Sequence, residues 1–126
     1  MRLLLDSHAL LWALFEPRRI STAVAAILDD ESAQVFVSPI SVFELELKKA
    51  KGALPFPEVA DWEAMLAEGG YILVPVTPAV AQNAVRLPRL HKDPWDRFLV
   101  AQAMRDGAVL ATVDAKIATY GVPTLW

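Results

Sequence analysis

The chain has 126 residues, 55% of them hydrophobic and 21% charged, with a formal net charge of −3 and no cysteine. This composition is typical of one packed globular domain, residues 1–126, and excludes a disordered chain, disulfides and thiolate metal sites. No apolar run reaches the roughly 18 residues of a membrane span, and the N-terminal apolar run is interrupted by Asp6 and His8. We therefore expect a cytoplasmic protein without membrane contact. Its negative charge argues against general nucleic-acid binding unless bound cations neutralise the acids.

Short apolar runs alternate with helical stretches along the chain. The runs that predict strands are residues 2–5, 34–37, 71–76, 108–113 and 123–126. The stretches that predict helices are residues 7–15, 22–30, 40–51, 58–68, 78–86, 94–106 and 115–120. Nearly continuous apolar strands between helices favour an α/β fold with a mostly parallel sheet of four to five strands, covered by helices on both faces. Ligands of such sheets bind beyond the carboxyl ends of the strands.

Two acids stand at predicted carboxyl ends of strands. Asp6 directly follows the apolar run "LLL", and Asp114 directly follows "LATV". Each also precedes a helical stretch, so each fits the role of a helix N-cap, which accepts backbone N–H bonds. Both interpretations place the two carboxylates at the same edge of the sheet.

Glu44 lies in the stretch "SPISVFELELKKAKG". Its spacing from Ser41 fits a capping box, and its spacing from Lys48 fits an i, i+4 ion pair. However, Pro39 suits the first helical turn with Ser38 as the cap, which starts the helix before Ser41. Helical periodicity then places Glu44 on the apolar stripe with Ile40, Phe43 and Leu47, and a carboxylate that faces the sheet needs a partner.

The stretch "HKDPWDRFLVAQA", residues 91–103, carries two more acids around a Pro-Trp pair. Asp93 before Pro94 has the residue types of an N-cap and a first helical position. Asp96 would lie in the first turn, where the helix dipole favours a negative charge. Periodicity aligns it with Leu99, Val100 and Ala103, whereas Arg97 and Arg105 mark the solvated side. Asp96 is therefore predicted to face the body of the protein. His91 could contact a phosphate or simply be solvated.

Four acids, Asp6, Glu44, Asp96 and Asp114, could thus converge. Two carboxylates repel by about 4 kcal/mol at 4 Å with an effective dielectric constant of 20, so such a cluster persists only if it is protonated or binds cations. Oxygen ligands without His or Cys favour Mg²⁺ or Mn²⁺. Such ions polarise a phosphoryl oxygen, lower the pKa of a bound water and align an in-line attack.

The stretches "LLLDSHALLWAL", "SPISVFELELKKAKG", "HKDPWDRFLVAQA" and "LATVDAKIATYGVPTLW" resemble the PIN-domain ribonucleases in order and spacing. The resemblance is strongest to the VapC toxins of type II toxin–antitoxin pairs and covers nearly the whole chain. It implies a three-layer α/β/α domain and Mg²⁺- or Mn²⁺-dependent endonucleolytic cleavage of RNA. It also implies a homodimer and a cognate antitoxin whose tail lies across the acidic groove.

The resemblance assigns roles to individual residues. Metal-binding and catalytic roles fall on the four acids named above, Asp6, Glu44, Asp96 and Asp114. Asp93 becomes an auxiliary acid, and Ser7 and Thr112 supply hydroxyls beside the site. Ser7 stands where such toxins often have Thr, and Trp95 where Phe is usual; neither change replaces an acid.

Two other functions also place acids at strand ends. The first is phosphoryl transfer to an Asp in a receiver-like or dehalogenase-like domain, but the chain reads Asp6-Ser7-His8, without an Asp-x-Asp, and lacks the strand-end Lys of a receiver. The second is a non-catalytic PIN-fold binding module, against which the presence of all four acids counts. The basic stretches 48–51 and 86–92 either guide an RNA backbone or form a solvated face.

Overall fold

In the computed structural model of the chain, residues 1–89 and 93–126 are described, and His91 lies outside these ranges. A sheet of five strands in the order β3-β2-β1-β4-β5 forms the centre, and every pairing in it is parallel. The strands are β1 (Arg2–Leu5), β2 (Gln34–Val37), β3 (Ile72–Leu73), β4 (Val109–Ala111) and β5 (Thr124–Leu125). The prediction of a mostly parallel sheet of four to five strands is confirmed.

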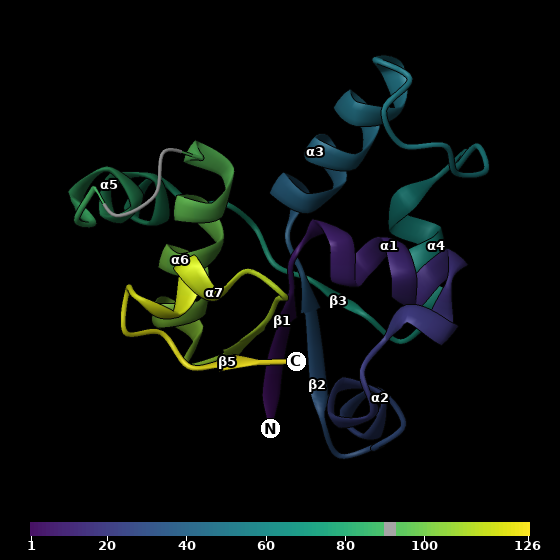
Figure 1. The fold of residues 1–126 in the computed structure, drawn as a ribbon, viewed down its shortest axis with the longest axis horizontal. Helices are drawn as coiled ribbons and strands as arrows, with labels where there is room; N and C mark the ends of the chain where they lie inside the picture. Colours follow the sequence, from purple (N-terminus) through teal and green to yellow (C-terminus); the bar gives the residue numbers. More distant parts are fainter. Residues whose placement is uncertain (90–92) are drawn as a thin grey trace.

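Helices connect successive strands (Figure 1). They are α1 (Ser7–Phe15), α2 (Thr22–Leu28), α3 (Pro39–Ala50), α4 (Trp62–Glu68), α5 (Pro78–Arg86), α6 (Pro94–Asp106) and α7 (Ala115–Ala118), with a short 3₁₀ turn η1 (Pro17–Arg19) that the sequence analysis did not predict. Each helix from α1 to α7 follows a Ser, Thr or Asp whose side chain accepts a backbone N–H bond from its first turn. The chain thus marks its helix starts locally. Among the described residues, no helix is long and apolar enough to cross a membrane.

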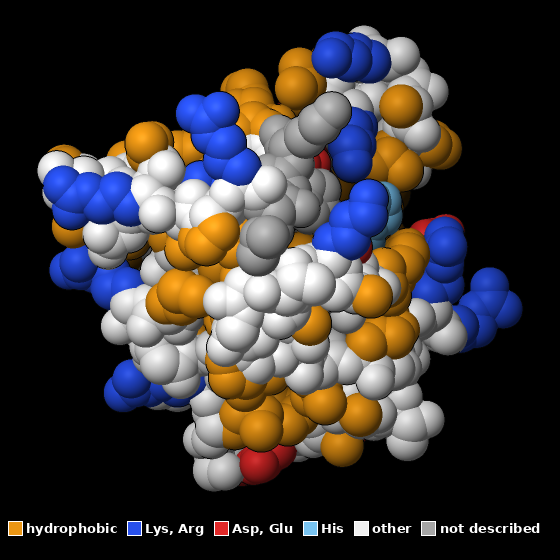
Figure 2. Space-filling view, turned by 60° about the vertical axis from the view of Figure 1, so that its left-hand side comes forward, with side chains coloured by type: hydrophobic (Ala, Val, Ile, Leu, Met, Phe, Trp, Pro, Cys, Tyr) orange, Lys and Arg blue, Asp and Glu red, His pale blue; other side chains and the backbone are white. Residues whose placement is uncertain are grey.

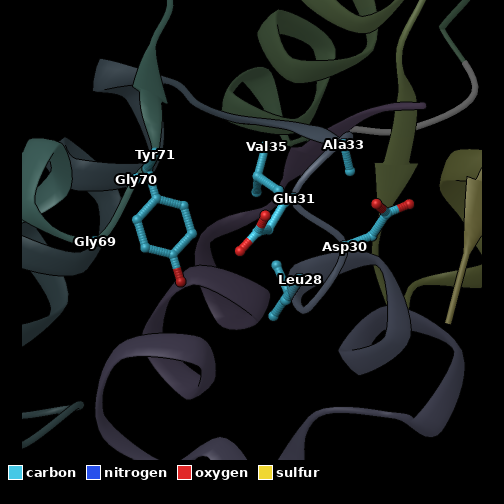
Figure 3. Close-up of a pocket in the computed structure, with 8 residues that line it drawn as sticks. All are labelled: Leu28, Asp30, Glu31, Ala33, Val35, Gly69, Gly70 and Tyr71. Atoms are coloured by element: carbon cyan, nitrogen blue, oxygen red, sulfur yellow. The ribbon is translucent and has the colours of Figure 1, made fainter.

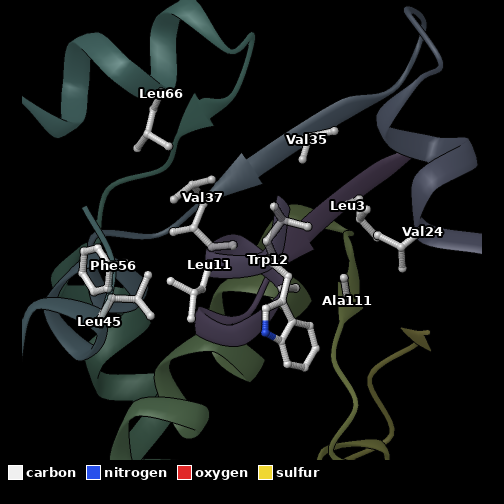
Figure 4. Close-up of a cluster of buried hydrophobic side chains, with 13 residues drawn as sticks. Leu3, Leu11, Trp12, Val24, Val35, Val37, Leu45, Phe56, Leu66 and Ala111 are labelled. Atoms are coloured by element: carbon white, nitrogen blue, oxygen red, sulfur yellow. The ribbon is translucent and has the colours of Figure 1, made fainter. Parts of the chain in front are cut away.

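Alternate residues of the central strands pack into two different cores, because successive side chains of a strand point to opposite faces. Leu3 and Leu5 of β1 belong to a cluster that includes side chains from α1, α2 and α4, and Figure 4 shows this cluster around Trp12. Leu4, between them, packs instead with side chains of α6 and α7. Helices therefore cover both faces of the sheet, as the predicted three-layer α/β/α fold requires.

Strand β3 differs from its prediction. The stretch 71–76 was expected to be a buried strand, but β3 contains two residues, and both side chains are exposed at the edge of the sheet. The strand ends where the Gln102 side-chain amide of α6 donates to the carbonyls of Val74 and Pro75, at 3.4 and 3.3 Å. Pro75 also lacks an N–H with which to continue a ladder.

Several other boundaries are narrower than predicted. Helix α4 begins at Trp62 rather than at residue 58, because Asp61 caps it and accepts the Ala64 N–H at 3.1 Å. Helices α2 and α7 end two residues early, at Leu28 and Ala118. Strands β4 and β5 are also shorter than their apolar runs. The order and type of the predicted helices and strands agree with the structure.

Arg97 was predicted to mark the solvated side of its helix; it is half-buried there and is fixed by hydrogen bonds to a neighbouring helix. Its guanidinium group donates to the carbonyls of Leu87, Pro88 and Val85 at 2.7, 2.8 and 3.2 Å. These carbonyls lie at and just beyond the carboxyl end of α5, where helical carbonyls lose their intrahelical partners. Arg97 therefore joins the end of α5 to the first turn of α6, the turn that also carries Asp96.

We predict that Arg97→Met destabilises the fold by about 2 kcal/mol, because hydrogen bonds to a charged donor contribute about 1.5–3 kcal/mol and several carbonyls lose their donor. Urea denaturation measures the change. Arg105→Met, at an exposed position of the same helix, is the matched control and should change stability by less than about 0.5 kcal/mol. Equal effects of the two substitutions would contradict the role given to Arg97.

Candidate active site

The carboxyl ends of the three central strands lie at one level. Leu5 of β1 pairs with Val37 of β2 on one side and with Ala111 of β4 on the other. The residues that follow, Asp6 and Thr112 among them, therefore emerge at the same edge. The strand order also reverses beside β1, since β2 and β3 lie on one side of it and β4 and β5 on the other. Ligands of open α/β sheets bind at such a reversal.

Helix α3 begins at Pro39 with Ser38 as its cap, as predicted, and the capping box of Ser41 and Glu44 does not form. The Ser41 hydroxyl instead donates to the carbonyl of Leu5 at 3.4 Å, which attaches α3 to the end of β1. Glu44 lies one turn further along and is only 7% exposed. The prediction that this carboxylate faces the protein interior is confirmed.

Within residues 1–89 and 93–126, Glu44 contacts a hydroxyl and an ammonium group besides the neighbouring acids. The Ser7 hydroxyl, at the start of α1, donates a hydrogen bond to Glu44 Oε2. Lys48 Nζ lies 3.6 Å from the same oxygen, so the i, i+4 ion pair also forms. The two contacts fix the orientation of the carboxylate and partly balance its charge.

Glu44, Asp93 and Asp96 form a three-carboxylate group. One oxygen from each can be chosen so that all three atoms lie within 4.8 Å of one another. Opposite ligands of one Mg²⁺ are about 4.2 Å apart, so small side-chain adjustments would bring the three oxygens around a single ion. Among the described residues no other three His, Cys, Asp or Glu side chains meet this criterion. The donor set therefore fits a hard divalent cation.

Asp93 lies closer to the centre of the site than its predicted auxiliary role implied. Its Oδ1 accepts the Trp95 N–H at 2.9 Å, so it caps α6 as expected. It also joins Glu44 and Asp96 in the three-carboxylate group. The spacing of three residues between Asp93 and Asp96 is the signal for this, because N-cap and third helical positions lie on the same turn.

Asp6 and Asp114 lie at the same edge but are not members of that group. Asp6 Oδ1 accepts the Ala9 N–H at 2.8 Å and caps α1, and Asp114 Oδ1 accepts the Lys116 N–H at 2.9 Å and caps α7. The side chain of Thr112 hydrogen-bonds to Asp6, and its Oγ1 accepts the Asp114 N–H at 3.0 Å. Thr112 thus connects the two acids.

Burial raises the pKa of Asp6, and the negative charge of Glu44 raises it further, while the hydrogen bonds from Thr112 and Ala9 and the charge of His8 act in the opposite direction. The net pKa lies above its ordinary value. The ionised Asp6 side chain is therefore held in the folded protein at a loss of stability.

A separate hollow of about 330 Å³ lies at the amino ends of strands β2 and β3, away from the acids described above. It is lined by residues from the segments 28–35 and 69–71 (Figure 3). Of the two acids that line it, Asp30 and Glu31, Asp30 already accepts hydrogen bonds from the backbone N–H and the hydroxyl of Ser32, at 2.9 and 2.7 Å. Burial raises the pKa of Tyr71 there. None of the site residues predicted from the sequence lines this hollow, and it is not the candidate active site.

Comparison with known proteins shows the family of the chain. The sequence profile of the PIN domain matches residues 3–122 of the chain. The chain belongs to the PIN-domain family. Ribonuclease VapC22 of Mycobacterium tuberculosis is 36% identical to this PIN domain over 131 aligned residues, which cover 98% of this chain and 97% of the relative.

Solved structures share the fold of this PIN domain. A chain in the crystal structure of VapBC2 from Rickettsia felis, bound to a DNA fragment from their promoter, superposes with a TM-score of 0.66 at 11% identity, covering 99% of this chain and 98% of that one. A chain in the structure of VapBC-1 from nontypeable Haemophilus influenzae gives a TM-score of 0.65 at 14% identity, covering 99% and 97%. At these identities the likeness concerns the fold.

We predict that Asp6→Asn stabilises the metal-free protein at neutral pH. Asn caps a helix about as well as Asp, so the substitution removes the buried charge and keeps the cap. Because the folded-state pKa is raised, protonation favours folding: the contribution of Asp6 to stability is greatest at low pH and is lost as the pH rises through that pKa. The gain in melting temperature should therefore be present at pH 7.5 and shrink toward pH 4.

Thermal melts in the presence of a chelator measure this difference. Asp6→Ala is the control, since it removes both the charge and the cap, whose loss costs about 1 kcal/mol. A melting temperature of Asp6→Asn below that of the wild type at pH 7.5, or a difference that does not change with pH, would refute the account.

Proposed function

We propose that this PIN domain is a metal-dependent RNA endonuclease, the toxin of a type II toxin–antitoxin pair. The observation that carries the proposal is the group of Glu44, Asp93 and Asp96 at the reversal point of a PIN-domain sheet. Two further acids, Asp6 and Asp114, follow at the same edge. The 36% identity to a protein named a ribonuclease supports the substrate class.

The proposed cofactor is Mg²⁺ or Mn²⁺, held by Glu44, Asp96 and Asp93 with Asp6 and Asp114 completing the acidic edge. When bound, such an ion polarises a phosphoryl oxygen and lowers the pKa of water. The chain itself supplies orientation. Ser7 directs the Glu44 carboxylate, Thr112 connects Asp6 with Asp114, and Lys48 places a cation where a substrate phosphate would approach.

The alternative of phosphoryl transfer to an aspartate fits less well. Asp6 would be the acceptor, yet its side chain is buried and one of its oxygens already binds the Ala9 N–H. An acceptor carboxylate has to reach the phosphorus atom of the donor, and burial of the Asp6 side chain restricts that approach. A non-catalytic module would have no need to retain mutually repelling carboxylates.

We further propose that a cognate antitoxin covers the site in the cytoplasm and that the toxin is a homodimer. The structural neighbours from R. felis and H. influenzae are VapBC assemblies. A hollow of about 480 Å³ beside the acidic edge, lined by residues of α1 such as His8 and Trp12 and by the exposed Val113, offers apolar surface to a partner. A basic antitoxin side chain would complement the acids.

The partner proposal predicts the mass of a dimer for the purified toxin by light scattering at micromolar concentration. Co-expression with the neighbouring open reading frame should yield a complex, and the complex should cleave RNA more slowly than the free toxin. A monomeric mass at these concentrations would contradict the proposed homodimer.

The metal proposal predicts that Asp96→Asn reduces RNA cleavage at least about a hundredfold, as loss of one group that stabilises a transition-state charge does. The same substitution should reduce the rise in melting temperature that Mn²⁺ causes in the wild type, because a ligand that binds only the folded state stabilises it by mass action. The measurements are cleavage of total RNA, read by sequencing of 5′ ends, and thermal melts with and without Mn²⁺.

Asp93→Asn and Asp93→Ala separate the two roles of Asp93. Asn keeps the cap and removes the charge, whereas Ala also removes the cap and costs about 1 kcal/mol. Both should weaken the Mn²⁺-induced shift, and Ala alone should lower the stability of the metal-free protein. The metal proposal fails if Asp96→Asn cleaves RNA like the wild type and keeps the full shift.

A further inference from the structure

Phe43 is an exposed aromatic side chain beside the candidate active site. It directly precedes Glu44 on α3, and half of its surface, 50%, is exposed. Helical periodicity had placed it with the apolar stripe that faces the sheet, and this was wrong. In the structure the carboxylate is buried and the neighbouring phenyl ring is exposed, the reverse of the usual distribution of these residue types.

The ring of Phe43 rests on Trp95. Their ring centroids are 5.1 Å apart and their planes are tilted by 54°. Trp95 belongs to α6, directly before Asp96 and two residues after Asp93. The two aromatic residues therefore lie within two positions in sequence of the three members of the three-carboxylate group. Trp95 contacts the Phe43 ring, and Phe43 stays 50% exposed in spite of this contact.

The surroundings of this pair suit a nucleic-acid strand better than a protein core. The pair borders carboxylates whose proposed metal would hold a phosphate, and Lys48 on the same helix adds a cation 3.6 Å from Glu44. Figure 2 shows one face of the molecule on which several Lys and Arg side chains and many hydrophobic side chains are exposed, with few Asp and Glu side chains between them. A phosphate at the acids would bring its own nucleoside to the aromatic pair, because base and phosphate belong to one nucleotide.

We propose that Phe43, supported by Trp95, stacks on a nucleobase adjacent to the scissile phosphate of single-stranded RNA. The proposal rests on the proposed function, whose site it extends. Unstacked bases of single-stranded RNA commonly bind aromatic side chains in this way, and each such contact contributes substantially to affinity. Phe43 is then a positioning residue that selects unpaired RNA segments.

The test compares the binding of short fluorescent single-stranded RNA oligonucleotides, in Mn²⁺, by the full-length wild type and variants. Phe43→Ala should weaken binding by about five- to a hundredfold. Phe43→Leu, which keeps apolar volume without a flat π face, should weaken it similarly, and Phe43→Tyr should bind like the wild type. Val85→Ala truncates an equally apolar side chain that is 81% exposed on α5, and should have no effect.

An abasic scan locates the contact. One abasic position in the oligonucleotide should weaken binding by the wild type, because the base that stacks on Phe43 is missing. The same abasic position should not weaken binding by Phe43→Ala further, because this variant has already lost the ring. The Mn²⁺-induced rise in melting temperature should be the same in Phe43→Ala and the wild type.

Unchanged RNA binding by Phe43→Ala, or a loss that no abasic position cancels, would overturn the proposal. The proposal would also be overturned if the wild type bound no RNA. It would be overturned as well if Phe43→Ala kept its RNA affinity but changed from dimer to monomer, because the ring would then belong to a contact between two copies. RNA binding by the wild type without cleavage would instead refute the proposed endonuclease and leave the stacking contact in place.

Discussion

The negative charge that the fold concentrates at the carboxyl edge of its sheet is the constraint on which the rest of the site depends. Glu44 is buried, and one of its oxygens lies within 4.8 Å of an oxygen from each of Asp93 and Asp96. Because carboxylates at such distances repel by several kcal/mol, the chain has to balance them. It does so partly with Ser7 and Lys48, whose contacts with Glu44 are direct. The proposed divalent cation would balance more of this charge.

Capping and acidity are combined in the same residues. Asp6, Asp93 and Asp114 each accept a backbone N–H at the start of a helix, so a helix terminus positions each carboxylate and offsets part of its charge. This arrangement explains how a small domain can hold five acids at one edge and remain folded. It also explains why substitution by Asn and by Ala should have different consequences at these positions.

Much of the fold could be predicted from sequence because its signals are local. Caps, prolines at first helical positions and apolar runs define the order of the elements, and the position of Asp6 and Glu44 follows from strand ends and helical periodicity. Features that depend on distant contacts could not be predicted. Strand β3 ends where Gln102 binds the carbonyls that follow it, and Arg97 donates hydrogen bonds to the carbonyls at the end of α5.

In the site too, some features could be predicted from local sequence patterns and others could not. Periodicity predicted a buried Glu44 correctly but also predicted a buried Phe43. A spacing of about 100° per residue gives the side of the helix on which a residue lies, but not whether another element covers that side. The double role of Asp93 was hidden behind its strong signal as a cap. Both differences lie next to the acids, where local preferences and function impose different demands on one residue.

Anomalous X-ray scattering from crystals of the wild-type protein grown with Mn²⁺ tests the central claim most directly. The account predicts an anomalous peak about 2.0–2.3 Å from carboxylate oxygens of Glu44 and Asp96, with Asp93 contributing directly or through water, and no such peak in crystals of Asp96→Asn. Well-ordered crystals at saturating Mn²⁺ with no peak at these carboxylates, or with a peak only elsewhere, would contradict it.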